Sequence, residues 1–232
     1  MKKDIRSDKP TVVVIDDDSS VCEALRGLFD SVGLSAQTYQ SVQEFITNDR
    51  SNRPGCLVVD IRLPGRSGLE LQDMLVKAGT PRSVVFISGH VDVPMAVRAM
   101  RSGAVDVLTK PVREQDLLEA VYKAIRQDAS FRKQAMLRAS LGSRYATLTV
   151  REREIMALVV TGMQNRQIAA EAQIAEATVK LHRGQVMRKM VADSVATLVR
   201  MADFLDDCQA DTSNQSTDTI GPLASFRHLS SN

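Results

Sequence analysis

Apolar and polar positions follow two different periods along the chain, and the change of period divides it into two parts. In the first part, short apolar runs alternate with stretches in which apolar residues recur every three to four positions. The runs are predicted strands, at residues 11–15, 35–40, 56–59, 83–88 and 105–109. The stretches are predicted helices, at residues 19–33, 41–48, 68–79, 93–103 and 114–127. Five strand–helix repeats predict a mostly parallel sheet covered by helices on both faces.

The second part contains no strand-like run. Residues 128–144 are polar with scattered Ala, Met and Leu, and they predict a helical linker. Residues 145–205 predict a small all-α domain of four short helices, of which the first begins at a capping box formed by Thr149 and Glu152. Residues 206–232 are rich in Ser, Thr, Asn and Asp with little periodicity, and they predict a disordered tail.

Polar residues follow four of the five predicted strands of the first part. Asp16, Asp17 and Asp18 follow the first, Asp60 ends the third, Ser88 ends the fourth, and Lys110 follows the fifth. The carboxyl ends of parallel strands share one edge, so these groups should converge there. Each feature alone is more typical of a solvated turn or loop. Their coincidence at four strand ends instead predicts a site.

The residue types at this edge suit phosphoryl chemistry. Neighbouring carboxylates repel one another and need a cation, and their hard oxygen atoms favour Mg²⁺. A carboxylate is also a nucleophile toward phosphorus, which gives an aspartyl phosphate. Lys110 supplies a compact positive charge and Ser88 a hydroxyl donor, and both suit an incoming phosphoryl group.

The motifs "VVDIRLPGRSGLEL", "FISGH" and "GAVDVLTKP", with the acidic pair Asp16-Asp17, resemble those of a two-component receiver domain over residues 10–127. The resemblance implies a doubly wound sheet with strand order 2-1-3-4-5 and a cis peptide between Lys110 and Pro111. It implies that Asp60 accepts a phosphoryl group from a sensor histidine kinase, with Ser88 and Lys110 in contact with that group. It also implies four Mg²⁺ ligands: Asp16, Asp17, Asp60 and the backbone carbonyl of Arg62.

One position departs from the receiver pattern. Receivers commonly carry Tyr or Phe three residues before the lysine, where this chain has Val107. A valine has no ring to swing inward and little rotamer freedom. We therefore expect the phosphorylation signal to run through Ser88 and the surface formed by residues 92–112.

The net charge of +2 is unevenly distributed along the chain. Residues 1–125 carry −1, residues 126–205 carry +6, and residues 206–232 carry −3. The basic block favours an anionic partner. Within it, a helix at 165–173 is joined by a tight connection to a helix at 177–190 that carries several cations, which predicts a helix-turn-helix. A small bundle with a solvated basic face is the alternative.

The segments "LTVRE", "GMQNRQIA" and "ATVKLHRGQVMRKM" resemble a LuxR-type DNA-binding domain, and their arrangement behind a receiver resembles FixJ-like response regulators. The resemblance implies that the helix at 177–190 lies in the major groove of double-stranded DNA. The candidates for contacts with base edges are Lys180, Leu181, Arg183 and Gly184. The candidates for phosphate contacts are Thr178, Arg188 and Lys189, with Arg166 and Gln167 as further backbone contacts. The last helix, with Val195, Leu198, Val199 and Ala202, resembles a dimerisation helix; a stripe facing the domain core is the alternative.

The implied function is a transcription regulator and not an enzyme. Phosphorylation of Asp60 would promote formation of a homodimer and binding to promoter DNA, with RNA polymerase as a further partner. A haloacid-dehalogenase-type enzyme would need an aspartate where this chain has Arg62. A ligand-sensing LuxR regulator would use tryptophan, and this chain has none. Constitutive DNA binding without phosphorylation remains as an alternative.

The beginning of the chain and its cysteines predict a cytoplasmic protein. The apolar stretch at residues 12–15 is too short for a signal peptide and runs into three aspartates. No apolar run is long enough to span a membrane. The three cysteines show no metal-binding spacing and fit reduced thiols.

Overall fold

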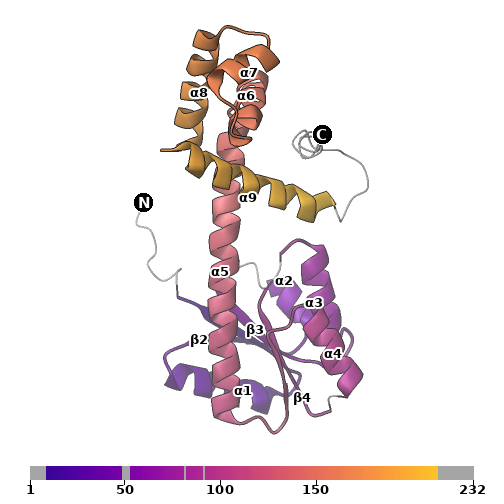
Figure 1. The fold of residues 1–232 in the computed structure, drawn as a ribbon. Helices are drawn as coiled ribbons and strands as arrows, with labels where there is room; N and C mark the ends of the chain where they lie inside the picture. The colour runs from indigo at the N-terminus through magenta and orange to yellow at the C-terminus, as the bar shows by residue number, and fades with distance from the viewer. Residues whose placement is uncertain (1–8, 49–52, 81, 91, 214–232) are drawn as a thin grey trace. The chain divides into compact units, whose positions relative to one another are not determined.

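A computed structural model describes residues 9–48, 53–80, 82–90 and 92–213, with side chains described as far as residue 205 (Figure 1). The chain forms two compact units, divided between Lys133 and Gln134. The first unit is an α/β domain and the second is all-helical, as the sequence predicted.

The first unit is built on a five-stranded parallel sheet. Its strands are β1 (Thr11–Ile15), β2 (Ser35–Tyr39), β3 (Gly55–Asp60), β4 (Val84–Ser88) and β5 (Asp106–Thr109). They lie in the order β2-β1-β3-β4-β5, which confirms the expected topology. All residues of the strands β1, β3 and β4 are buried, because helices cover both faces of the sheet.

Helices cover the sheet in two layers, as Figure 1 shows. They are α1 (Ser19–Ser31), α2 (Val42–Asn48), α3 (Gly68–Lys77), α4 (Val93–Arg101) and α5 (Glu114–Ala146). Side chains alternate between the faces along each strand. Val13 and Ile15 therefore pack in one apolar cluster with residues of α2, α3 and α4, while Val12 and Val14 pack in a second cluster with residues of α1 and α5.

The helix α5 is longer than the sequence predicted. The predicted helix at 114–127 and the predicted linker at 128–144 form one continuous helix of 33 residues. Asp128 is only 2% exposed, and its carboxylate accepts the Gly55 N–H at 2.9 Å and pairs with Arg132 Nε at 2.6 Å. Arg132 also donates to the Arg53 carbonyl at 2.7 Å. We therefore place the end of the receiver after Arg132, since these contacts fasten α5 to the start of β3.

Gly55 makes this fastening sterically feasible. Its φ is +147°, and a Cβ at this position would lie 1.9 Å from the Thr11 carbonyl oxygen on β1. Only glycine fits here, and it lets the buried Asp128 carboxylate reach the backbone N–H. No local pattern in the sequence predicts this contact, because its two partners are 73 residues apart.

The second unit contains α6 (Val150–Val160), α7 (Asn165–Glu171), α8 (Glu176–Met190) and α9 (Val195–Ser213). Its core joins Ile155, Ile168, Val179 and Met190 with Leu141 from the last turns of α5. On α9, Leu198 and Ala202 are buried in this core. For these two residues, the core stripe was the correct alternative, and they are not available to a dimer interface.

The helix α9 corrects one further expectation. It continues to Ser213, into the segment from residue 206 that was predicted to be disordered. Residues 206–213 contain neither glycine nor proline, so their polarity alone does not end the helix. The rest of the predicted tail, residues 214–232, lies outside the described residues.

We expect Asp128→Ala to lower the free energy of unfolding of the first unit by about 3 kcal/mol, because it leaves the Gly55 N–H buried without an acceptor and breaks the pair with Arg132. Asp128→Asn keeps an oxygen acceptor and should lose less than half of that. Pulse hydrogen exchange in urea, read by mass spectrometry over residues 55–60, measures both. Equal free energies of unfolding for Asp128→Ala and wild type would show that the contact does not stabilise the first unit.

Candidate functional site

The register of the sheet brings two buried carboxylates together. Ile15 of β1 pairs with Val59 of β3, so the next residues, Asp16 and Asp60, leave the sheet side by side. Asp16 is fully buried and Asp60 is 6% exposed, while Asp17 is exposed. One oxygen from each of the three carboxylates lies within 4.8 Å of the others. The predicted convergence of Asp16, Asp17 and Asp60 is therefore present.

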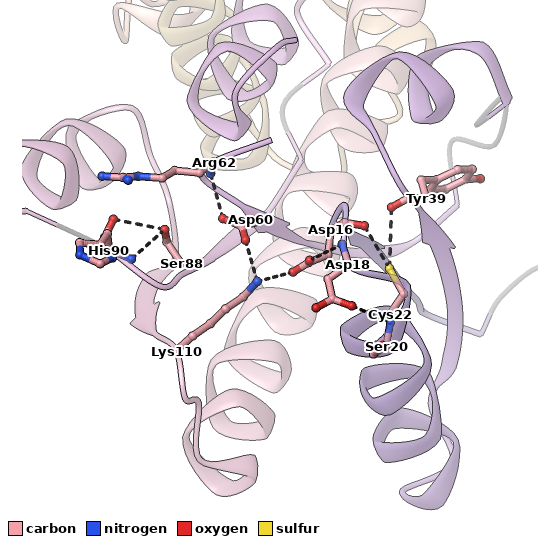
Figure 2. Close-up of polar contacts among 10 residues, drawn as sticks. All are labelled: Asp16, Asp18, Ser20, Cys22, Tyr39, Asp60, Arg62, Ser88, His90 and Lys110. Atoms are coloured by element: carbon pink, nitrogen blue, oxygen red, sulfur yellow. Dashed lines mark hydrogen bonds and ion pairs between the residues drawn. The ribbon is translucent and has the colours of Figure 1, made fainter. Parts of the chain in front are cut away.

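Lys110 lies between the two buried carboxylates, as Figure 2 shows. Its Nζ is 2.7 Å from Asp16 Oδ2 and 2.6 Å from Asp60 Oδ2. Its backbone N–H donates to the Ser88 carbonyl at 2.9 Å, which ties the end of β5 to the end of β4. The peptide between Lys110 and Pro111 is cis, as expected.

Burial and pairing act in opposite directions on these charges. Burial raises the pKa of Asp16 above its ordinary value, even though the bond from Lys110 opposes the shift. Burial alone would lower the pKa of Lys110, but the hydrogen bonds to Asp16 and Asp60 outweigh it, and the pKa is raised overall. Lys110 therefore stays a cation at neutral pH.

The donor set fits Mg²⁺. The formal charges of three carboxylates and one ammonium sum to −2, which one divalent cation would neutralise. Hard carboxylate oxygens and an exposed position that admits water are what Mg²⁺ requires. The Arg62 N–H donates to Asp60 Oδ1 at 2.8 Å and so orients the Asp60 carboxylate. Coordination by the Arg62 carbonyl stays a prediction.

Ser88 is buried at the end of β4, and its hydroxyl faces its own loop. The Oγ atom donates to the His90 carbonyl at 3.3 Å, as Figure 2 shows. Val107 is half-buried and packs against the same apolar cluster as Met95 of α4. At this strand end Ser88 supplies a hydroxyl group, whereas the Val107 side chain supplies apolar packing.

The predicted DNA-contact residues separate into two groups on the second unit. Exposed positions recur along one side of α8, at Ala177, Lys180, Leu181, Gly184 and Arg188, and we call this set the exposed ridge. Leu181 is 61% exposed although it is apolar. Arg166 and Gln167 are exposed on α7. Thr178, Arg183 and Lys189 are half-buried, and the last two have partners inside the unit.

Two family models match the chain in the same places. The response regulator receiver domain matches residues 12–122, and the luxR family of bacterial regulatory proteins matches residues 146–202. Nodulation protein W of Bradyrhizobium diazoefficiens is 46% identical over 199 residues, which cover 86% of this chain and 88% of the relative. The chain belongs to the response regulators with a LuxR-type DNA-binding domain.

Other relatives agree with this assignment. Response regulator protein TodT of Pseudomonas putida is 42% identical over 87% of this chain and 89% of its own length. A low-resolution structure of the response regulator StyR is 42% identical, covers 84% of this chain and 98% of StyR, and has a TM-score of 0.75. Full-length FixJ from B. japonicum is 36% identical, covers 86% of this chain and 98% of FixJ, and has a TM-score of 0.52.

In this response regulator Lys189, for which a phosphate contact stays a prediction, has partners inside the second unit. Lys189 Nζ lies 2.6 Å from the buried Glu152 carboxylate and 3.1 Å from the Thr147 carbonyl. Glu152 also accepts the Thr149 N–H at 2.7 Å, which completes the predicted capping box. Next to Lys189, the Met190 carbonyl accepts a hydrogen bond from Arg144 Nη1 at 3.2 Å. These contacts fasten the end of α8 to the start of α6 and the end of α5.

Sequence inspection found Thr149 and Glu152 by their spacing but missed Lys189 as a partner, since it lies 37 residues away. It also missed Asn165, which binds Arg183. The helix α8 begins without a side-chain cap, because its N-cap residue is Ala175. Among the helices of the described ranges, none is long and apolar enough to cross a membrane.

We expect Glu152→Gln to destabilise the second unit by about 1–2 kcal/mol at neutral pH. The hydrogen bond from Lys189 and then the Thr149 N–H hold the pKa of Glu152 below its ordinary 4.5. The unfolded state therefore takes up the proton first, and stability rises with pH. The difference from wild type should be complete above pH 4.5 and vanish as pH falls through the folded-state pKa.

Pulse hydrogen exchange in urea over residues 150–190, with unfolding at several pH values, measures this. Glu154→Gln is the matched control, because Glu154 pairs with Arg151 on the surface at 2.7 Å. Exposed pairs contribute less than about 1 kcal/mol. A pH-independent difference for Glu152→Gln would contradict the assignment.

Proposed function

We propose that this response regulator accepts a phosphoryl group on Asp60 from a sensor histidine kinase. The proposal rests on the position of the Asp60 carboxylate. It lies 2.6 Å from Lys110 Nζ and close to the carboxylates of Asp16 and Asp17 at the edge of the sheet. An Asp60 oxygen would attack the phosphorus of a phosphohistidine. The P–N bond breaks, the imidazole leaves with the electron pair and takes a proton, and an acyl phosphate remains.

The groups around Asp60 each have a task in this transfer. Asp16, Asp17, Asp60 and the Arg62 carbonyl would hold Mg²⁺, which neutralises charge on the phosphoryl oxygens when bound. Lys110 now neutralises Asp60, and it would follow the negative charge onto the phosphoryl group. The Arg62 N–H would keep its hydrogen bond to Oδ1 of Asp60, and Oδ2 would attack as Lys110 moves from it to the phosphoryl group.

The signal would leave the site through Ser88. Its hydroxyl would exchange the His90 carbonyl for a phosphoryl oxygen and so shift the loop that leads into α4. On α4, Val93, Val97 and Met100 form an exposed apolar stripe, and Val93 is 76% exposed. Such a stripe suits burial against a second copy of the chain. Homodimers formed through residues 92–112 would then present two copies of α8 to paired half-sites in promoter DNA.

The remaining partners follow from this function. The net charge of +6 over residues 126–205 favours binding of double-stranded DNA. Regulation of transcription brings the bound dimer to RNA polymerase. A protein that receives phosphate from the kinase and then binds a promoter must reach both of them from the cytoplasm, so we place the protein there.

Asp60→Asn should abolish phosphorylation from a radiolabelled small-molecule phosphodonor, because an amide oxygen is a far poorer nucleophile than a carboxylate. Removal of Mg²⁺ with EDTA should lower wild-type labelling by at least tenfold. Release of the label by hydroxylamine and by alkali identifies an acyl phosphate. Undiminished labelling of Asp60→Asn would overturn the assignment of the acceptor.

Ser88→Ala should retain labelling of Asp60 within about tenfold but lose phosphorylation-driven dimerisation, because the hydroxyl that reports the phosphoryl group is gone. Sedimentation of the full chain with and without phosphodonor measures the coupling. Ser83→Ala is the matched control: it removes another buried hydroxyl next to β4, one without a hydrogen-bond partner among the described residues. Unchanged dimerisation of phosphorylated Ser88→Ala would contradict this route.

A further inference from the structure

Arg183 does not lie on the exposed ridge of α8, although the sequence placed it among the residues that contact base edges. Each helical residue advances by about 100°, so Arg183 lies about 200° around the helix from Leu181. That direction is close to those of Val179 and Met190, which are buried. The exposures agree with this geometry, because Leu181 is 61% exposed and Arg183 is half-buried.

A single hydrogen bond fixes the guanidinium in this position. Arg183 Nη1 donates to Asn165 Oδ1 at 2.6 Å, and Asn165 is the first residue of α7. The bond therefore joins the two helices of the helix-turn-helix. Asn165 is neutral, so the charge of Arg183 is positioned but not cancelled.

Two other cations of α8 differ in this respect, and Arg188, which binds the neutral Gln185, differs in being exposed. Lys189 is paired with the buried Glu152 at 2.6 Å, and Lys180 faces Glu176 at 3.7 Å. Within the part of the chain that the structure describes, Arg183 forms no ion pair. A half-buried cation with a neutral partner is poorly compensated, and an anion placed beside it would be held firmly.

We infer that Asn165 and Arg183 act as one unit that binds a DNA phosphate at the junction of α7 and α8. Base reading is left to Lys180, Leu181 and Gly184 on the exposed ridge. Reading a guanine would need a free guanidinium fork aimed into the groove, whereas a phosphate accepts a hydrogen bond from many directions. Asn165 is a positioning residue here: it holds the Arg183 side chain in one rotamer before DNA arrives, which reduces the entropy lost on binding.

The inference rests on the proposed DNA binding, and the test uses the phosphorylated full chain. A duplex is first selected from a random library with wild-type protein. Affinities for that duplex and for all its single-base-pair variants are then measured over a range of salt concentrations. Arg183→Ala should weaken binding about tenfold on every duplex alike. It should also reduce the slope of log affinity against log salt by about 0.9, the value for one lost phosphate contact.

Companion variants separate positioning from direct contact. Asn165→Ala should weaken binding about threefold on every duplex, and the double variant should bind as Arg183→Ala does, because Asn165 acts only through Arg183. Arg183→Lys keeps the positive charge, so its slope of log affinity against log salt should equal that of wild type. In the Arg183→Lys background, adding Asn165→Ala should no longer weaken binding. Leu181→Ala, on the exposed ridge, is the control, and it should alter preference at one or two base pairs without changing the slope. Circular dichroism checks that each variant is folded.

Three outcomes would overturn the inference alone. Loss of preference at a particular base pair in Arg183→Ala would make Arg183 a base reader. Unchanged affinity and slope in Arg183→Ala would reduce the bond to a structural tie between helices. Independent, multiplying effects of the two alanine substitutions would show that the residues do not act as a unit. A wild-type chain that enriches no duplex would instead count against the proposed DNA binding, and with it against this inference.

Discussion

The placement of the Lys110 ammonium between two buried carboxylates is the interaction on which the receiver site depends. Asp16 and Asp60 lie side by side because β1 and β3 are in register, and without a cation their charges would oppose that register. Lys110 relieves the repulsion but leaves the three-carboxylate cluster short of positive charge. The same arrangement therefore stabilises the sheet edge and leaves there a carboxylate donor set that suits a divalent metal ion.

The sequence predicted those features whose causes are local or follow from strand order. Apolar runs predicted the strands, and residues at strand ends predicted Asp16, Asp60, Ser88 and Lys110 as one site, because parallel strands end at a common edge. Contacts between distant residues could not be predicted in this way. The partners of Asp128, Lys189 and Arg183 are set by packing between helices and strands, and no spacing in the sequence marks them.

The helix α5 belongs to both units because each unit binds a different part of it. Asp128 and Arg132 fasten it to the start of β3, while Arg144 binds the carbonyl at the end of α8. The intervening residues from 133 to 137 are exposed and make no comparable buried contact among the described residues, while Arg138 lies over the Phe204 ring of α9. The polar composition of residues 128–144 predicted a linker over this whole range. Among the described residues, only its middle portion lacks side chains that bind α5 to the rest of a unit.

Charge in the DNA-binding unit is likewise divided between internal structure and the outer surface. A net charge of +6 overstates what is offered to a ligand, since Lys189 is neutralised by Glu152 and serves to hold α8 in place. Arg183 is different, because its partner is neutral and its positive charge remains effective. A basic residue on a recognition helix thus contributes to nucleic-acid binding according to its partner and its direction around the helix, and its presence in the sequence alone does not decide its role.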